Sequence, residues 1–190
     1  MVIYGTCRLA SRSQAYGLLA LAAGEHWGLS PLPALARQAG GKPYFPDAAD
    51  YSFNLSHSGH LALCALDCAP VGVDIQMVKA WRPALVRRVC SSRELDWLGP
   101  EDRETYWSRF TQLWALKECR VKHSGAGLRQ PIAQIQVPLP EGTQGLYRLD
   151  GLWFRLYPGE GWRGAVCGLV PPPEEIRWVD PPFPVQPRPG

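Results

Sequence analysis

The chain has 190 residues, of which 46% are hydrophobic and 19% are charged, and its formal net charge is +3. This composition is typical of one globular domain or two small ones with a sizeable core, and it argues against a disordered chain. The charge is too small to indicate nucleic-acid binding by itself, although it is compatible with an anionic ligand or an acidic partner. No apolar run is long enough to span a membrane, so we expect neither a membrane nor a nucleic acid as partner.

The cysteines indicate a reducing compartment. The six cysteines are scattered and form no CxxC pair, and the chain is longer than a disulfide-stapled mini-domain. The N-terminal residues lack the apolar core of a secretory signal. We therefore expect free thiols and a cytoplasmic protein.

The first part of the chain predicts a helix followed by strands. Residues 13–23 carry a broad apolar face that ends at Gly24. A second, short helix is expected after Pro31, through Leu35 to Ala39, with Gly40-Gly41 as its stop. Strand-like apolar runs follow at 51–55, 61–66 and 71–75.

The second part repeats this order. Ser91 to Glu94 fits a capping box, and apolar residues at helical spacing predict the longest helix over 103–123, ended by Gly125. Strand-like runs come next, at 132–137, 146–149, 152–157 and 165–170. The proline-rich tail over 181–190 is expected to be disordered. The sequence thus predicts an α+β fold with an N-terminal half over 1–78 and a C-terminal half over 79–180.

A buried aspartate is expected in the strand at 71–75. Alternate residues of a strand share a face, so Asp74 and Gln76 point one way while Val73 and Ile75 point into the core. A carboxylate among buried apolar residues needs a compensating partner, and a divalent metal ion is one such partner. An aspartate that caps a turn at the strand end is the alternative.

The longest helix carries a charged pair beside a tryptophan. Glu118 and Lys122 are four residues apart and share one face with Trp114. The alternative is a surface ion pair that stabilises the helix by roughly 0.3 kcal/mol. Trp114 should face the core, so we expect the pair to lie near the buried boundary.

Two further segments suit a phosphate ligand. Residues 54–60 place serine and histidine side chains at a strand end, where a polar turn is the alternative. No GxSxG elbow surrounds Ser56 or Ser58, so a serine hydrolase is not indicated. Residues 40–44 lack the spacing of a Walker loop, and a loop with one solvated lysine is the alternative.

Taken in order, these motifs resemble those of the Sfp-type 4′-phosphopantetheinyl transferases. The resemblance runs from about residue 41 to about residue 170. The motifs that carry it are Gly41-Lys42-Pro43, Asn54 to Ser58, Gly72 to Ile75, Trp114 to Lys122, and Gly125 to Leu128. It implies two similar α+β halves in a pseudo-twofold arrangement, within a monomer, and an active site in the cleft between the halves.

The resemblance also implies roles for individual residues. Asp74 and Glu118 would bind Mg²⁺, with Mn²⁺ as a possible substitute, and Glu118 would accept the proton of the carrier serine, directly or through water. Lys122 would hold the pyrophosphate of coenzyme A and take part in catalysis. The remaining coenzyme contacts would be Ser56 and His57 at the phosphates, Gly41, Lys42 and Pro43 at the adenosine 3′-phosphate end, and Lys117 in a secondary role.

One position departs from the pattern. Many members carry a glutamate where this chain has Gln76, which leaves the third protein ligand of the metal open. Two neighbouring charges should lower the pKa of Glu118, because a lysine and a metal ion both favour the carboxylate. The N-terminal part is short, and Arg8 and Arg12 are its candidates for contacts with the coenzyme phosphates.

The function implied by the resemblance is a Mg²⁺-dependent transfer. The 4′-phosphopantetheine group of coenzyme A would move to a serine of an apo acyl or peptidyl carrier protein, which gives the holo carrier and adenosine 3′,5′-bisphosphate. The reactive arm would project toward solvent or the carrier. Two alternatives stay open: a binding module without catalysis, supported by Gln76, and a trimeric holo-carrier synthase, which the chain length disfavours.

Overall fold

The computed structural model describes residues 1–11, 13–125, 127 and 131–184, and it confirms the α+β class. Its elements are β1 (Val2–Thr6), α1 (Gln14–Trp27), β2 (Ala36–Arg37), β3 (Pro43–Tyr44), β4 (Ser52–Ser58), β5 (Leu61–Asp67), β6 (Val71–Met77), α2 (Pro83–Val89), α3 (Ser92–Leu98), α4 (Arg103–Ser124), the 3-10 turn η1 (Ile132–Gln134), β7 (Gly145–Leu149), β8 (Leu152–Gly159), β9 (Trp162–Gly168) and β10 (Arg177–Trp178).

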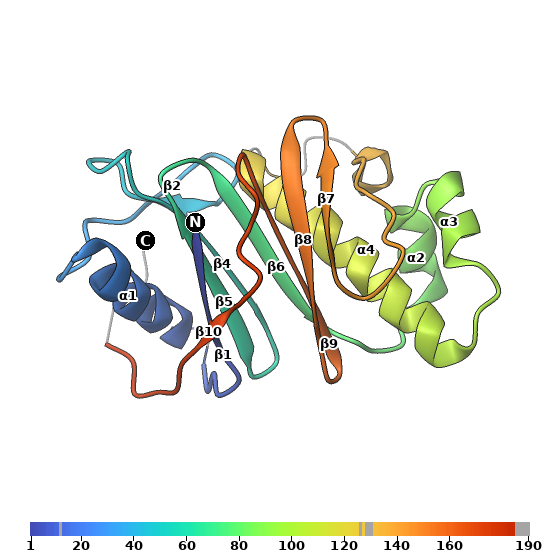
Figure 1. The fold of residues 1–190 in the computed structure, drawn as a ribbon, viewed down its shortest axis with the longest axis horizontal. Coiled ribbons are helices and arrows are strands. Elements are labelled where there is room, and N and C mark those ends of the chain that lie inside the picture. The colour runs from blue at the N-terminus through green and yellow to red at the C-terminus, as the bar shows by residue number, and fades with distance from the viewer. Residues whose placement is uncertain (12, 126, 128–130, 185–190) are drawn as a thin grey trace.

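Two four-stranded sheets lie between helices α1 and α4 (Figure 1). The first sheet has the strand order β10-β1-β5-β4, and the second has the order β6-β9-β8-β7. A separate hairpin joins β2 and β3. None of the helices in the described part of the chain is long and apolar enough to cross a membrane.

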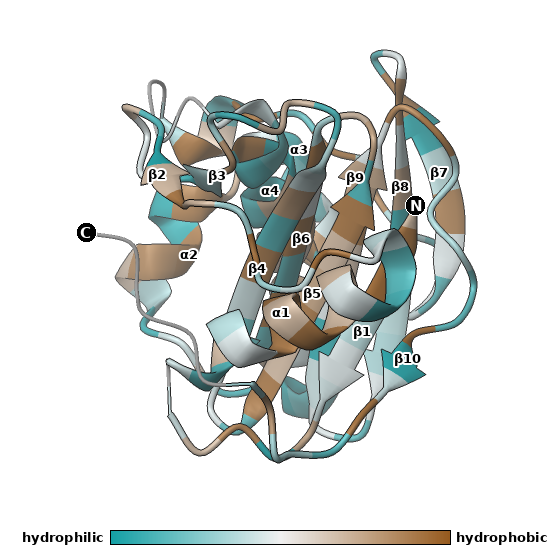
Figure 2. Ribbon diagram, turned by 90° about the vertical axis from the view of Figure 1, so that its left-hand side faces the viewer, coloured by the Kyte–Doolittle hydropathy of each residue, from teal (hydrophilic) through white to brown (hydrophobic). Residues whose placement is uncertain are grey.

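Three apolar layers hold these elements together. Helix α1 packs on the outer face of the first sheet, which it crosses in Figure 2, and α4 packs on the outer face of the second sheet. A third layer lies between the two sheets. Strand β5 serves two of these layers, because Ala62, Cys64 and Leu66 face α1 while Leu61 and Leu63 face the second sheet. This double burial explains its continuous apolar run.

The long helix and the capping box are confirmed. The side chain of Asp102 accepts hydrogen bonds from the first turn of α4, and Gly125 ends the helix with φ of 66°. Ser91 and Glu94 form the reciprocal capping box at the start of α3. Both caps satisfy backbone N–H groups that a helix start leaves without partners.

The short helix expected after Pro31, through Leu35 to Ala39, is wrong. Residues Ala36–Arg37 form strand β2, which pairs with β3 in a hairpin. The amide of Gln38 donates to the carbonyl of Lys42 at 2.9 Å, and Gly41 takes φ of 82° in the turn. The glycine pair therefore turns a hairpin, because glycine tolerates this positive φ, and does not stop a helix.

The strand expected over 132–137 is also wrong. The segment starts with the turn η1 and pairs with no strand in the described residues. Its apolar side chains Ile132, Ile135 and Val137 are buried beside α4. The carbonyl of Ile132 accepts a hydrogen bond from Lys117 Nζ at 3.0 Å, so a side chain takes the place of a neighbouring strand.

The two sheets do not each take up one continuous part of the chain, and the domain boundary expected at residue 78 stays a prediction. Strand β6 pairs with β9 in the second sheet, so this sheet begins at Val71. After β9 the chain returns to the first sheet, where β10 pairs in parallel with β1. The expected disordered tail is described as far as residue 184, and Phe183 packs against the core of α1. Residues 185–190 lie outside the described part of the chain.

Candidate active site

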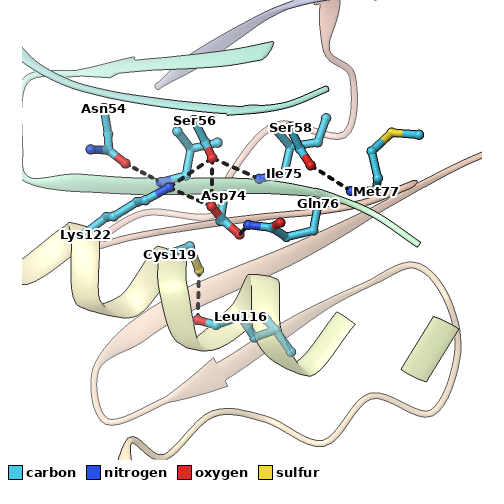
Figure 3. Close-up of polar contacts among 11 residues, drawn as sticks. Asn54, Ser56, Ser58, Asp74, Ile75, Gln76, Met77, Leu116, Cys119 and Lys122 are labelled. Carbon is cyan, nitrogen blue, oxygen red and sulfur yellow. Dashed lines mark hydrogen bonds and ion pairs between the residues drawn. The ribbon is translucent and has the colours of Figure 1, made fainter. Parts of the chain in front are cut away.

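Side chains of β4 hold the free edge of β6. The two strands belong to different sheets, yet three polar side chains of β4, spaced two residues apart, accept hydrogen bonds from backbone amides of β6. The bonds join Asn54 Oδ1 to Val73 N at 2.9 Å, Ser56 Oγ to Ile75 N at 3.3 Å, and Ser58 Oγ to Met77 N at 3.1 Å. We call these three residues the β4 polar row; Figure 3 shows them above β6.

Asp74 lies at the centre of a polar cluster beside this row. Asp74 is 1% exposed. Its side chain faces α4, whereas Val73 and Ile75 are buried between the sheets. Ser56 Oγ donates to Asp74 Oδ1 at 2.7 Å, and Lys122 Nζ lies 2.6 Å from the same oxygen. Gln76 Nε2 donates to Oδ2 at 2.9 Å. The expectation of a compensated buried carboxylate on this face is confirmed.

Helix α4 supplies the positive charge of the cluster. Lys122 reaches across from α4 and also bonds Ser56 Oγ at 2.9 Å (Figure 3). The helix can approach β6 this closely because residue 72 is glycine. A Cβ atom at that position would clash with the carbonyl oxygen of Cys119. The glycine of the Gly-x-Asp motif thus sets the distance between the helix and the strand.

Glu118 lies one turn before Lys122 on α4 and is partly buried. Burial raises the pKa of Glu118, and the charge of Asp74 raises it further, against a smaller opposing effect of Lys122. The lowering of this pKa was expected beside both a lysine and a metal ion; without the ion, burial and Asp74 outweigh Lys122. Asp74 on β6 and Glu118 on α4 are thus close enough for the charge of one to affect the other. Such a pair of carboxylates favours a bound cation or proton.

The cluster fits a hard divalent cation. Asp74, Glu118 and the amide oxygen of Gln76 offer the oxygen ligands that Mg²⁺ prefers, and Lys122 already stands as a cation on Asp74. The described residues contain no group of three or more histidine, cysteine or acidic side chains arranged around a metal position. Two carboxylates and one amide are therefore the side chains that could hold such an ion.

Lys42 joins the hairpin of β2 and β3 to the start of β6. Its Nζ donates to the carbonyls of Val71 at 2.9 Å and of His123 at 3.3 Å. Lys42 and Pro43 also border a cavity of about 290 Å³, which His123 lines as well. Burial lowers the pKa of Lys42 from its usual 10.5 to about 8.

This shift gives Lys42 a measurable effect on stability. Between pH 8 and 10.5 the unfolded chain keeps a proton on Lys42 that the folded chain has released, so this residue makes the free energy of unfolding rise with pH. We expect the difference in unfolding free energy between the wild type and Lys42→Met to grow from pH 7.5 to pH 10 in urea titrations. Lys79→Met, at an exposed position, is the control, and equal differences at both pH values would contradict the assignment.

The structure separates Lys117 from the other predicted residues. Its side chain is fully buried, and Nζ donates to Glu94 Oε2 at 2.7 Å and to the carbonyls of Val89 at 2.9 Å and Ile132 at 3.0 Å. An ammonium group has three donors, and these acceptors use them. Lys117 therefore ties α4 to its neighbours in the core, and its geometry does not support the expected contact with coenzyme A.

The remaining predicted residues are described in part. His57 follows Ser56 on β4, and it is partly exposed. Arg8 forms an exposed ion pair with Asp180 at 3.3 Å. Arg12, and Leu128 of the last motif, lie outside the described residues. The backbone role of Asn54 and Ser58 was not foreseen, although their spacing of two residues from Ser56 was a signal for it.

Comparisons with known proteins agree with the motifs. Residues 70–167 match the 4′-phosphopantetheinyl transferase superfamily. The chain is 34% identical over 145 residues to 4′-phosphopantetheinyl transferase Sfp of Bacillus subtilis (strain 168), which covers 73% of this chain and 65% of the relative. It is 33% identical over 160 residues to a 4′-phosphopantetheinyl transferase of Bacillus subtilis, covering 81% and 71%.

A relative from another group of bacteria gives the same result. The transferase AcpT of Salmonella typhimurium (strain LT2) is 37% identical over 116 residues, which is 59% of each chain. The chain thus spans about two thirds of the length of the Bacillus relatives and less of AcpT. The family match and the identities together show that the chain belongs to the 4′-phosphopantetheinyl transferase superfamily.

Proposed function

We propose that this protein transfers the 4′-phosphopantetheine group of coenzyme A to a serine of an apo carrier protein. The observation that carries the proposal is the buried carboxylate of Asp74, which pairs with Lys122 and whose charge raises the pKa of Glu118. All three residues belong to the motifs by which the chain resembles its family. Coenzyme A is the implied co-substrate, and an acyl or peptidyl carrier protein is the implied partner.

The reaction would exchange one P–O bond for another. The serine Oγ attacks the phosphorus that bears the pantetheine arm, and the bond from that phosphorus to the bridging oxygen of the pyrophosphate breaks. Adenosine 3′,5′-bisphosphate leaves with that oxygen. Such transfers need positioning and charge neutralisation more than covalent help from the protein.

The residues of the cluster would divide this work. Glu118 accepts the serine proton, directly or through water. The ammonium group of Lys122, which pairs with Asp74 in this structure, would turn to a phosphate of the coenzyme when the coenzyme binds. Ser56, His57, Lys42 and Pro43 are proposed as further coenzyme contacts. A Mg²⁺ ion on Asp74, Glu118 and Gln76 would neutralise the phosphate charge.

The topology supports a pseudo-twofold relation between two halves. In the first sheet, β1 precedes α1 and pairs antiparallel with β5, the last strand of that run. In the second sheet, β6 precedes α4 and pairs antiparallel with β9, again the last strand of its run. We propose that the cleft between the halves holds the site. Since β4, β6 and α4 of one chain supply the cluster, a monomer suffices.

The proposed compartment is the cytoplasm. All six cysteines are free, although four of them are buried in apolar surroundings. Free thiols in a chain of this size are typical of a reducing compartment. The formal charge of +3 would favour an acidic carrier surface.

The test is a transfer assay with a panel of apo carrier proteins. The protein is incubated with coenzyme A and Mg²⁺, and each carrier is weighed by intact-mass spectrometry. We expect a mass gain of one phosphopantetheine on at least one carrier, lost with EDTA and reduced by on the order of 10²-fold or more in Glu118→Gln.

Glu175→Gln, an exposed acidic residue, is the control and should keep full transfer. Coenzyme A binding without a mass gain on any acyl or peptidyl carrier would refute the transferase and favour the binding module instead. In that case Gln76→Glu is the variant that tests whether the amide accounts for the lost reaction.

A further inference from the structure

A groove of about 530 Å³ lies between residues 91–94 and the chain that leaves η1. We call residues 133–139 the groove segment, because they form most of its lining, and Leu149 at the end of β7 completes it. In Figure 1 the chain after η1 passes between β7 and the helices α2 and α3. The residues of the Asp74 cluster do not line this groove, which is therefore separate from the proposed active site.

The groove segment has the pattern of a strand but lacks a neighbouring strand. Ile135 and Val137 are 5% and 8% exposed, whereas Gln134 and Gln136 are exposed to solvent. This alternation is typical of extended backbone with one buried face. The segment pairs with no strand in the described residues. Extended backbone directs its N–H and C=O groups sideways, which is where a second strand would bond to them.

The backbone of residues 136–139 is almost free of hydrogen bonds. Arg120 donates to the carbonyl of Gln136. Among the residues that the structure describes, the amides of Gln136, Val137 and Leu139 have no acceptor. Open donors and acceptors along an extended segment are the template to which another chain can add as a strand.

The charge beside the groove favours an acidic occupant. Residues 79–93 contain five of the 20 basic residues and none of the 17 acidic ones, so the rest of the chain has a formal net charge of −2. Glu94, the acidic residue of the groove lining, is 5% exposed and pairs with Lys117 at 2.7 Å. The five basic side chains are exposed, and no carboxylate of the described residues lies within 4.0 Å of them: Lys79, Arg82, Arg87, Arg88 and Arg93.

We infer that this groove binds an extended acidic segment of a partner protein, which adds as a strand to residues 136–139 and places its carboxylates near Arg93. Apolar side chains at alternate positions of that segment would pack against Leu139 and Leu149, which both line the groove. The same positive charge would attract a nucleic acid. A nucleic acid, however, lacks the regular row of amide donors and carbonyl acceptors that pairs with extended backbone.

The probe is a fluorescein-labelled peptide of about eight residues, within the usual length of a strand, in which glutamate and valine alternate. Fluorescence anisotropy at low ionic strength measures its Kd, and NMR follows hydrogen exchange of the protein amides. We expect saturable binding. At a peptide concentration of about ten times Kd, exchange at the amides of Gln136, Val137 and Leu139 should slow about tenfold. The same peptide with every amide nitrogen methylated keeps its charge but cannot donate, and it should lose the binding.

Arg93→Glu reverses the charge at the groove and should weaken the peptide about fivefold or more. Arg103→Glu makes the same change at an exposed position that does not line the groove, and it should bind as the wild type does. The inference is overturned if the peptide does not bind, if the methylated peptide binds equally well, or if the three amides stay unprotected. A single-stranded oligonucleotide of the same length that binds more tightly would replace the peptide by a nucleic acid. The assay contains neither coenzyme A nor a carrier, so its failure leaves the proposed transferase untouched.

Discussion

Replacement of Lys117 by methionine is expected to lower the free energy of unfolding by about 3–5 kcal/mol, the loss typical of a broken buried ion pair. The Glu94 residue is 5% exposed, and without Lys117 its carboxylate would stay in the core with no positive charge. The carbonyls of Val89 and Ile132 would lose a donor as well. Urea unfolding followed by tryptophan fluorescence measures the change.

Two further variants identify the cause. In the double variant Lys117→Met with Glu94→Gln no charge stays buried, and an amide oxygen can still accept from Ser91 N to keep the helix cap. We expect the double variant to be more stable than Lys117→Met alone. Arg120→Met breaks the more exposed pair with Asp150 on the same helix and should cost about 0–1 kcal/mol. A double variant as unstable as the single one would mean that the ion pair is not the source of the loss.

Replacement of Asp74 by asparagine is expected to reduce transfer by at least on the order of 10²-fold, the effect of removing one electrostatic group from a reaction centre. Asparagine is close in shape, and its oxygen can still accept from Ser56 and Lys122. The negative charge that would hold both Lys122 and a metal ion is lost, however. Initial rates of carrier modification, measured by intact mass at saturating coenzyme A, give the change.

Asp67→Asn is the matched control for this variant. Asp67 is also buried, at 4% exposure, and it lies in the first sheet beside the N-terminal amino group at 3.6 Å, outside the cluster. This substitution should change stability and leave the rate of transfer close to that of the wild type. If both variants lose transfer equally while both stay folded, Asp74 has no special part in the reaction.

The polar motifs were predictable because each lies within a short, regular segment. Strand alternation placed Asp74 and Gln76 on one face, and helical spacing placed Glu118 and Lys122 on another. Each motif alone could also be explained by an ordinary structural role, such as a turn or a surface ion pair. Only the order of the motifs along the chain indicated a family. The meeting of β6 and α4 at Asp74 depends on the tertiary fold, which periodicity does not describe.

The errors have two physical causes. At 132–137 the apolar pattern correctly marked buried side chains, but the backbone partner was Lys117, 15 residues earlier, and no neighbouring strand. A contact distant in sequence therefore decided that outcome. In the segment after Pro31 the glycine pair was compatible with both a helix stop and a hairpin turn, and the local pairing of β2 with β3 decided between them. The pKa of Glu118 was expected from a lysine and a metal ion beside it, whereas without the ion burial and Asp74 outweigh the lysine.

The β4 polar row has a consequence for how the molecule can move. Asn54, Ser56 and Ser58 belong to the first sheet. The amides that donate to them belong to β6 of the second sheet, the strand that carries Asp74. A hinge motion that separated the two sheets at this edge would break all three bonds together. It would also break the hydrogen bond from Ser56 to Asp74. Such an opening would be an all-or-none, cooperative event. We therefore expect a ligand of the proposed site to be accommodated by side-chain rearrangement of Lys122 and Glu118, while the two sheets stay joined by these three bonds.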